Sequence, residues 1–152
     1  MRRLARLHAI VEHLRSRRAP VTVAAGAAVN AAGSIVDPAT GAVVAGGAPL
    51  GGAIDAGWRG QTTLIAVVTD APLDRDRCTV IARMASAGLA RTIYPAFTPF
   101  DGDLVIAAST GAGEVVADAV VAGLGDAAAR CVATAIVRAV ARPGYRNSGS
   151  VG

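Results

Sequence analysis

The apolar run Leu64–Thr69, LIAVVT, is the feature that most constrains how this chain of 152 residues folds. A nearly continuous apolar run is typical of a strand that is covered on both faces, whereas a half-exposed strand alternates polar and apolar residues. The length corresponds to one domain, and the order of strands and helices is mixed. We therefore expect an α/β protein in which buried strands lie between layers of helices.

The remaining elements follow from spacing and from residues that end helices and strands. Strands are expected at 21–29, 34–36 and 104–109, with a turn at 37–41 and a glycine-rich loop at 41–60. Asp74 is a suitable N-cap for a helix that ends near Thr92, and Asp126 for a last helix. The predicted inward positions of these two helices are Val80, Ile81, Met84, Ala85, Leu89, Val132, Ile136 and Val140.

The first 19 residues form a basic leader, with six arginines and one glutamate. Leu4, Leu7, Ile10, Val11 and Leu14 fall at helical spacing, which predicts an amphipathic helix that stops near Pro20. Three interpretations stay open: a membrane-surface or nucleic-acid arm, a solvated terminal helix, or a segment that does not belong to the fold. From residue 144 we expect a disordered tail to 152, so the domain proper is expected at 20–143.

Charge and composition narrow the function classes. The net charge is +4, but residues 20–152 carry nine arginines and ten acidic residues. The excess of positive charge therefore lies in the leader, and the rest of the chain is close to neutral. We expect no nucleic-acid partner, no membrane partner and a cytoplasmic location. The chain has no lysine, which excludes lysine chemistry and a complete phosphate-binding P-loop.

Metal and cofactor sites are not predicted. Cys78 and Cys131 lack paired spacing and fit small buried thiols. His8 and His13 both lie in the leader, far from either cysteine in sequence. We therefore expect neither a metal nor a cofactor.

Three polar features stand at the ends of the apolar strands: Asn30, the step Gly60-Gln61-Thr62-Thr63, and the turn Asp101-Gly102-Asp103. Loops at strand ends are where sites are built. Each feature also has a structural interpretation, because Asn and Asp-Gly favour turns and threonine favours strands. Taken singly, none of the three identifies a site.

Together, these features resemble a known family. The segments VTVAAGAAVNAAGSIVDPATG, QTTLIAVVTDAPL, ARMASAGLARTIYPAFTPFDGD and LVIAASTG are similar, in this order, to the DmpA-type aminopeptidases. That family includes L-aminopeptidase/D-Ala-esterases, β-peptidyl aminopeptidases and nylon-oligomer hydrolases. The similarity runs from about Val21 to Ile136 and leaves out the leader. It implies the αββα sandwich of the DmpA/ornithine acetyltransferase fold, here without the N-terminal region of the family.

The resemblance implies a reaction and a set of site residues. Family members cut themselves before a Ser or Thr, which corresponds here to the Gln61–Thr62 bond, and the freed residue becomes the nucleophile. Asp101 and Asp103 would orient and stabilise the Thr62 amine and hydroxyl, and Asn30 would be a candidate oxyanion donor. The implied substrate is a small peptide or amide, and the implied assembly is a homo-oligomer.

Two alternatives remain beside the aminopeptidase. Relatives with threonine as the nucleophile more often have Asn directly before it, whereas this chain has Gln61. Relatives also carry a long N-terminal region with a functional lysine, and this chain has no lysine. A truncated, inactive fragment or an interaction module is therefore the first alternative. Acyl transfer, as in the related ornithine acetyltransferases, is the second, although TPFDGD and GLAR favour the peptidases.

Overall fold

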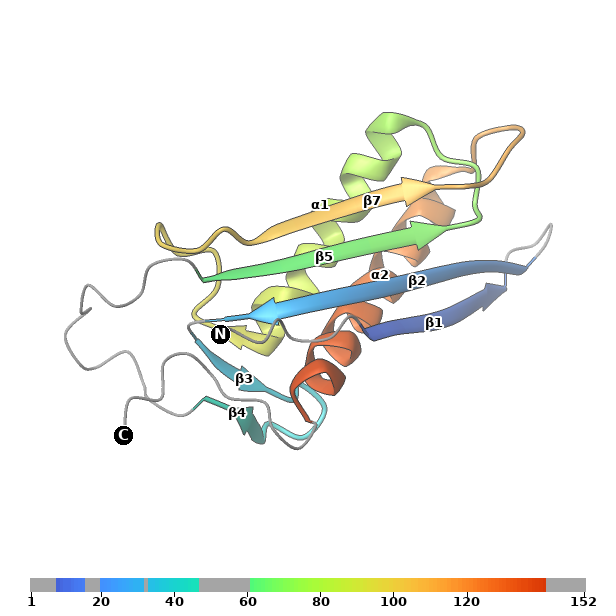
Figure 1. The fold of residues 1–152 in the computed structure, drawn as a ribbon. Coiled ribbons are helices and arrows are strands. Elements are labelled where there is room, and N and C mark those ends of the chain that lie inside the picture. The colour runs from blue at the N-terminus through green and yellow to red at the C-terminus, as the bar shows by residue number, and fades with distance from the viewer. Residues whose placement is uncertain (1–7, 16–19, 32, 47–60, 142–152) are drawn as a thin grey trace.

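A computed structural model describes residues 8–15, 20–31, 33–46 and 61–141 (Figure 1). Within these ranges it has seven strands and two helices. In chain order they are β1 His8–Arg15, β2 Pro20–Asn30, β3 Ser34–Val36, β4 Val43–Ala45, β5 Thr62–Thr69, α1 Arg75–Thr92, β6 Ile93–Tyr94, β7 Leu104–Ser109 and α2 Asp118–Val140.

The main sheet has the strand order β1-β2-β5-β7. β2 is antiparallel to both β1 and β5, whereas β7 is parallel to β5. A parallel neighbour requires a crossover connection. Here α1 provides it, between β5 and β7 (Figure 1).

Both helices cover the same face of this sheet (Figure 1). The odd-numbered residues of β2 and β5 point into that side, so strand alternation and helix periodicity meet in one core. The largest fully buried side chains there include Val23, Val67, Ile81, Leu89, Leu124, Val132 and Ile136. A second sheet, with the order β4-β3-β6, contributes Ile35 and Ile93 to the same core.

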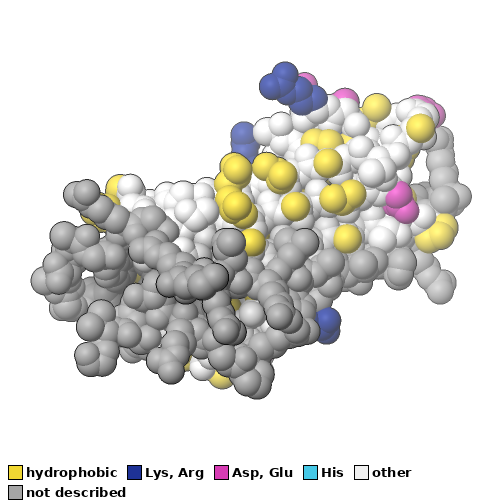
Figure 2. All heavy atoms as spheres, in the orientation of Figure 1, with side chains coloured by type: hydrophobic (Ala, Val, Ile, Leu, Met, Phe, Trp, Pro, Cys, Tyr) yellow, Lys and Arg dark blue, Asp and Glu magenta, His cyan; other side chains and the backbone are white. Residues whose placement is uncertain are grey.

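The opposite face of the main sheet is open, which corrects the expectation of strands covered on both faces. Leu64, Val68, Leu104 and Ile106 are each 41–55 % exposed. Figure 2 shows hydrophobic side chains gathered on this face of the molecule. The apolar run does predict a hydrophobic strand, but it carries no information on which part of the chain packs over each face of that strand.

The leader is a second correction, because residues 8–15 form strand β1 and not a helix. Its apolar residues satisfy a short helical pattern, yet pairing with β2 along all eight residues gives the strand more backbone partners than an isolated terminal helix has. Residues 1–7 and the tail from residue 142 lie outside the described residues.

Three smaller expectations change. Part of the glycine-rich loop is strand β4, and its residues 47–60 lie outside the described residues. α2 begins at Asp118, so Asp126 is no cap and instead forms an ion pair with Arg130 within the helix. Gly123 and Gly125 lower the helix propensity of this stretch, but Gly125 lets Met84 of α1 approach closely. Val80, expected inward, is exposed.

Other expectations are confirmed. Asp74 caps α1 by accepting a hydrogen bond from the Arg77 backbone N–H, and the helix ends at Thr92. The turn at 37–41 is closed by the Gly41 N–H donating to the Asp37 carbonyl at 2.7 Å. Cys131 is buried, although Cys78 is only half-buried. α2 is long and apolar enough to cross a membrane, yet most of that stretch is buried against the sheet and α1, as in a core helix.

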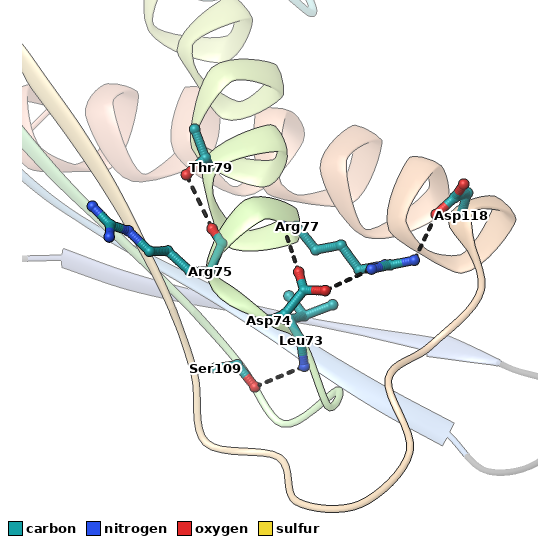
Figure 3. A network of polar contacts seen from close by, with 7 residues as sticks. All are labelled: Leu73, Asp74, Arg75, Arg77, Thr79, Ser109 and Asp118. Atoms are coloured by element: carbon teal, nitrogen blue, oxygen red, sulfur yellow. Dashed lines mark hydrogen bonds and ion pairs between the residues drawn. The ribbon is translucent and has the colours of Figure 1, made fainter.

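A polar network joins the start of α1 to the start of α2 (Figure 3). The Arg77 guanidinium bridges the carboxylates of Asp74 and Asp118, at 2.6 and 3.0 Å. Close by, the Ser109 hydroxyl at the end of β7 accepts from the Leu73 N–H and donates to the Ala71 carbonyl. The Ser109 hydrogen bonds tie the end of β7 to the segment that leads from β5 into α1.

Candidate active site

Thr62 is the first residue of β5, and the sheet brings the other predicted residues to it. Asn30, the last residue of β2, is its direct partner in the antiparallel register. Side chains of directly opposed residues stand on the same face, about 5 Å apart at Cβ. On the other side of β5, Gln61 forms a parallel bridge with Asp101. Residues some 30 to 40 positions apart in the chain therefore meet at one sheet edge, as the sequence predicts.

The Thr62 hydroxyl is turned back onto the peptide bond before it. Its Oγ1 donates a hydrogen bond to the Gln61 carbonyl oxygen at 2.6 Å. The same oxygen accepts from the backbone N–H of Gly102 at 2.9 Å. Gln61 is 5 % exposed, so this carbonyl lies in a nearly dry position with two donors on one oxygen.

Asp103 contacts the backbone next to the candidate nucleophile. Its Oδ1 accepts from the Thr63 N–H at 2.7 Å, and its Oδ2 accepts from the Phe97 N–H at 3.1 Å. The carboxylate thereby ties the start of β5 to the loop that precedes β7. Because Thr63 directly follows Thr62, a side-chain hydrogen bond links Asp103 to the residue next to the candidate nucleophile.

Asp101 has a different set of contacts. Its Oδ2 accepts from both the backbone N–H and the hydroxyl of Thr98, at 3.1 and 2.6 Å. The Asp101 N–H in turn donates to the Thr98 carbonyl at 3.0 Å. Three hydrogen bonds thus close the turn 98–101, which carries Gly102 directly behind it.

Two contributors were missed by the sequence interpretation, namely Thr98 and the Gly102 backbone. Thr-x-x-Asp within TPFDGD is the spacing of a side chain that closes a turn, and this signal could have indicated Thr98. Gly102 is required by space: a Cβ built there would lie 2.8 Å from Thr62 Oγ1. Within the described residues, no three His, Cys, Asp or Glu side chains form a group suited to a metal ion.

Comparison with protein families gives a match to the model of peptidase family S58 over residues 9–144. The match begins inside the leader, so the expectation that the whole leader lies outside the resemblance is wrong. Uncharacterized aminopeptidases of Mycobacterium tuberculosis and Mycobacterium leprae are 38 % and 36 % identical to the chain. They match 79 % and 78 % of it, over 44 % and 40 % of their own length. The chain thus spans less than half of these relatives.

Solved structures share the fold. The PH0078 protein of Pyrococcus horikoshii superposes with a TM-score of 0.68 at 23 % identity, over 94 % of this chain and 42 % of its own. An L-aminopeptidase D-Ala-esterase/amidase of Ochrobactrum anthropi, described as a variant of the Ntn hydrolase fold, gives 0.66 at 22 %, over 88 % and 39 %. A Burkholderia β-aminopeptidase gives 0.64 at 25 %, over 94 % and 44 %. The predicted α/β class is confirmed.

Proposed function

Because this chain belongs to peptidase family S58, as its motifs predicted, we propose that it is an aminopeptidase or amidohydrolase with Thr62 as its nucleophile. In this proposal the chain cuts itself between Gln61 and Thr62, and Thr62 becomes a new N-terminus. The observation that carries the proposal is the contact of the Thr62 hydroxyl with the Gln61 carbonyl at 2.6 Å. The hydroxyl is thus already folded over the bond that it has to break.

The chemistry explains why a terminal threonine serves as nucleophile. A threonine hydroxyl is weakly nucleophilic at neutral pH and needs an adjacent base. Cleavage would free the α-amine of the same residue, and an unperturbed α-amine has a pKa of about 8. A base with a pKa near the working pH is the most effective. One residue would then supply both the nucleophile and its base.

The neighbouring polar groups fit supporting roles. Asp103, hydrogen-bonded to the Thr63 N–H, is well placed to hold and charge-stabilise the freed amine of Thr62. Asp101 would act mainly through the turn that it closes with Thr98. Asn30, opposite Thr62 in the sheet, is the candidate side-chain donor to an oxyanion.

Acylation of Thr62 by a peptide or amide, followed by hydrolysis of the ester, is the reaction proposed. The Ochrobactrum protein is named for L-aminopeptidase and D-Ala-esterase/amidase activity, and the Burkholderia protein for β-aminopeptidase activity. We extend to this chain the shared chemistry, removal of an N-terminal residue from a small peptide or amide. We also propose a homo-oligomer in the cytoplasm, acting without cofactor, nucleic acid or membrane.

An inactive fragment or interaction module is the second candidate, and the open sheet face favours it. Leu104 and Ile106 are about half exposed on the face that also carries Thr62. A site with one uncovered side admits water, which weakens the electrostatic interactions that such chemistry relies on. Under this candidate, the chain would need further protein on that face before it could act.

The first test is the intact mass of the purified chain over time. We expect fragments 1–61 and 62–152 to appear, together with hydrolysis of aminoacyl p-nitroanilides. Thr62→Ala removes the hydroxyl and is expected to abolish both. Thr110→Ala is the matched control, because it removes a hydroxyl that hydrogen-bonds Thr69 at the other end of β5. A Thr62→Ala chain that is still processed would refute the proposal, and an uncut parent would favour the inactive fragment.

A further inference from the structure

The Gln61 carbonyl has a second donor whose position has chemical meaning. In the self-cleavage proposed above, Thr62 Oγ forms a bond to the Gln61 carbonyl carbon, and the π electrons of that carbonyl move onto its oxygen. The Gln61–Thr62 amide bond then breaks, and the hydroxyl proton ends on the Thr62 nitrogen. The product is an ester, which water cleaves to a Gln61 carboxylate and a free Thr62. Negative charge therefore develops on the oxygen that accepts from Gly102 N at 2.9 Å.

We propose that Gly102 is a catalytic residue of this self-cleavage, with its backbone N–H as an oxyanion donor. The inference rests on the proposed function, since it concerns the same bond. The Thr62 hydroxyl must leave the Gln61 oxygen in order to attack the carbon, whereas the Gly102 N–H stays. At the moment when charge develops, the N–H is thus a donor that the fold already holds at the carbonyl oxygen.

The surrounding turn holds this donor rigidly. The three hydrogen bonds between Thr98 and Asp101 fix the residue before Gly102. Asp103, the residue after it, is fixed by the Thr63 and Phe97 N–H groups. A donor that needs no rearrangement stabilises a developing charge most strongly. The acids on either side of Gly102 therefore also act as positioning residues for its N–H.

The missing side chain of Gly102 is the second part of the proposal. A Cβ would stand 2.8 Å from Thr62 Oγ1 and 3.6 Å from its Cγ2. Such a distance is too short for a carbon, so any side chain would push the hydroxyl away from the Gln61 carbonyl. Glycine thus lets one residue supply the donor and leave room for the nucleophile.

The test exchanges single backbone N–H groups for ester oxygens in the full chain. At Gly102, the exchange removes the donor and adds no side chain. The matched control is the same exchange at Thr110, whose N–H donates to the Thr69 carbonyl at 2.9 Å, at the far end of the β5–β7 pair. Thermal unfolding compares the stability of the two chains. In the parent chain and in side-chain variants, hydroxylamine cleaves the Thr62 ester as soon as it forms, so the fragment yield reports the acyl shift itself. The two ester chains are followed without hydroxylamine, because it would also cleave the introduced ester, and the masses of fragments 1–61 and 62–152 identify the cut.

We expect the Gly102 ester to slow fragment formation by roughly 100- to 1,000-fold, the usual effect of losing one oxyanion donor. The Thr110 ester is expected to cut at the parent rate. In a second arm, Gly102→Ala keeps the N–H but displaces the hydroxyl, and at least about tenfold slower cutting is expected.

The outcomes separate this inference from the proposed function. If the parent cuts and both Gly102 chains cut as fast as it does, the role of Gly102 is overturned while Thr62 keeps its own. Equal slowing by the two esters would also overturn the role, because it would reflect lost strand pairing alone. A parent that never cuts overturns the proposed function, and the role of Gly102 with it.

Discussion

Thr63 stands beside the candidate nucleophile but points the other way, into the core. It is 0 % exposed, and its hydroxyl oxygen is buried without a hydrogen-bond partner among the described residues. An unpaired buried hydroxyl costs free energy that an apolar group of the same shape avoids. Its backbone, in contrast, is needed, because the Thr63 N–H donates to Asp103.

Thr63→Val replaces this hydroxyl with a methyl group and is expected to raise the free energy of unfolding by about 1 kcal/mol. Thr92→Val is the matched control, since Thr92 is equally buried but its hydroxyl donates to the Gly88 carbonyl at 2.7 Å. That variant is expected to lose about 1 kcal/mol. Urea unfolding at neutral pH measures both. A destabilised Thr63→Val chain would contradict the prediction and would indicate a partner for this hydroxyl.

At the scale of single residues, the sequence predicts which polar residues come together, but it does not predict which hydrogen bonds they form. Polar residues at the ends of strands mark Asn30, Thr62 and the acids of the turn, and β-sheet pairing brings them together as expected. The division of labour between Asp101 and Asp103 does not follow from a motif in which the two differ by two positions. It depends on which backbone N–H each carboxylate reaches, and this is fixed only once the turn has closed.

At the scale of elements, the contact between α1 and α2 depends on a glycine. A Cβ on Gly88 would overlap the backbone carbonyl of Ala129, which cannot move aside as a flexible side chain would. Gly123 has open space where its Cβ would stand, although it also lies in a helix. The two glycines therefore form a matched pair that separates close packing from helix propensity.

Gly88→Ala is expected to lower the free energy of unfolding by about 1–3 kcal/mol, because the helices must separate to admit a methyl group. Gly123→Ala is expected to raise it by roughly 0.5–1 kcal/mol through helix propensity. Thermal unfolding of both variants measures the difference. A Gly88→Ala chain that is as stable as the parent, or that is stabilised like Gly123→Ala, would show that the helices are packed less tightly than described.

The start of α1 predicts a dependence on pH. The hydrogen bond from the Arg77 backbone N–H holds the pKa of Asp74 below its ordinary value of 3.8, and the Arg77 side chain lowers it further. Because this pKa is depressed in the folded state, the carboxylate stabilises the fold above about pH 3.8. The contribution is lost as the pH falls through the lower, folded-state pKa. Acid conditions should therefore loosen this helix start.

Asp74→Asn is expected to flatten the loss of stability between about pH 5 and about pH 2. Urea unfolding across this range measures it for the parent and the variant. Asp76→Asn, which removes a carboxylate from the same helical turn, is the control for charge alone. If the parent and the Asp74→Asn chain lose stability in parallel on acidification, this carboxylate contributes nothing to the pH dependence.

Helices and strands were predicted unequally well, for a physical reason. α1 was found to the residue because its cap, Asp74, and its apolar stripe lie within one stretch of sequence. The start of α2 and the strand character of residues 8–15 were missed, because both depend on partners distant in the chain. Local propensity is a weak guide where a glycine is used for packing or where a strand is held by its neighbour.

At the scale of the whole molecule, the main sheet has one covered and one open face. The helices bury the odd-numbered side chains of β2 and β5, while Leu64 and Val68 stand on the other side. On that side, the middle of β2 carries only the small residues Ala24, Gly26 and Ala28. The larger side chains of β5 and β7 therefore protrude farther from the open face and form its raised part. Among the described residues, Figure 2 shows hydrophobic side chains at the centre of this face and charged side chains only toward its margins. A surface of this kind favours association over solvation.

The isolated chain is accordingly expected to bind a hydrophobic dye and to self-associate as its concentration rises. Leu104→Thr combined with Ile106→Thr keeps residues that favour strands while making the raised part of the face polar, and should reduce both effects severalfold. Val80→Thr, at an exposed apolar residue of α1 on the covered side of the sheet, is the control and should change neither. Dye fluorescence and sedimentation measure the two effects. A parent chain that stays monomeric and does not increase the dye fluorescence would mean that this face is already covered. That result would remove the main support for the inactive-fragment candidate.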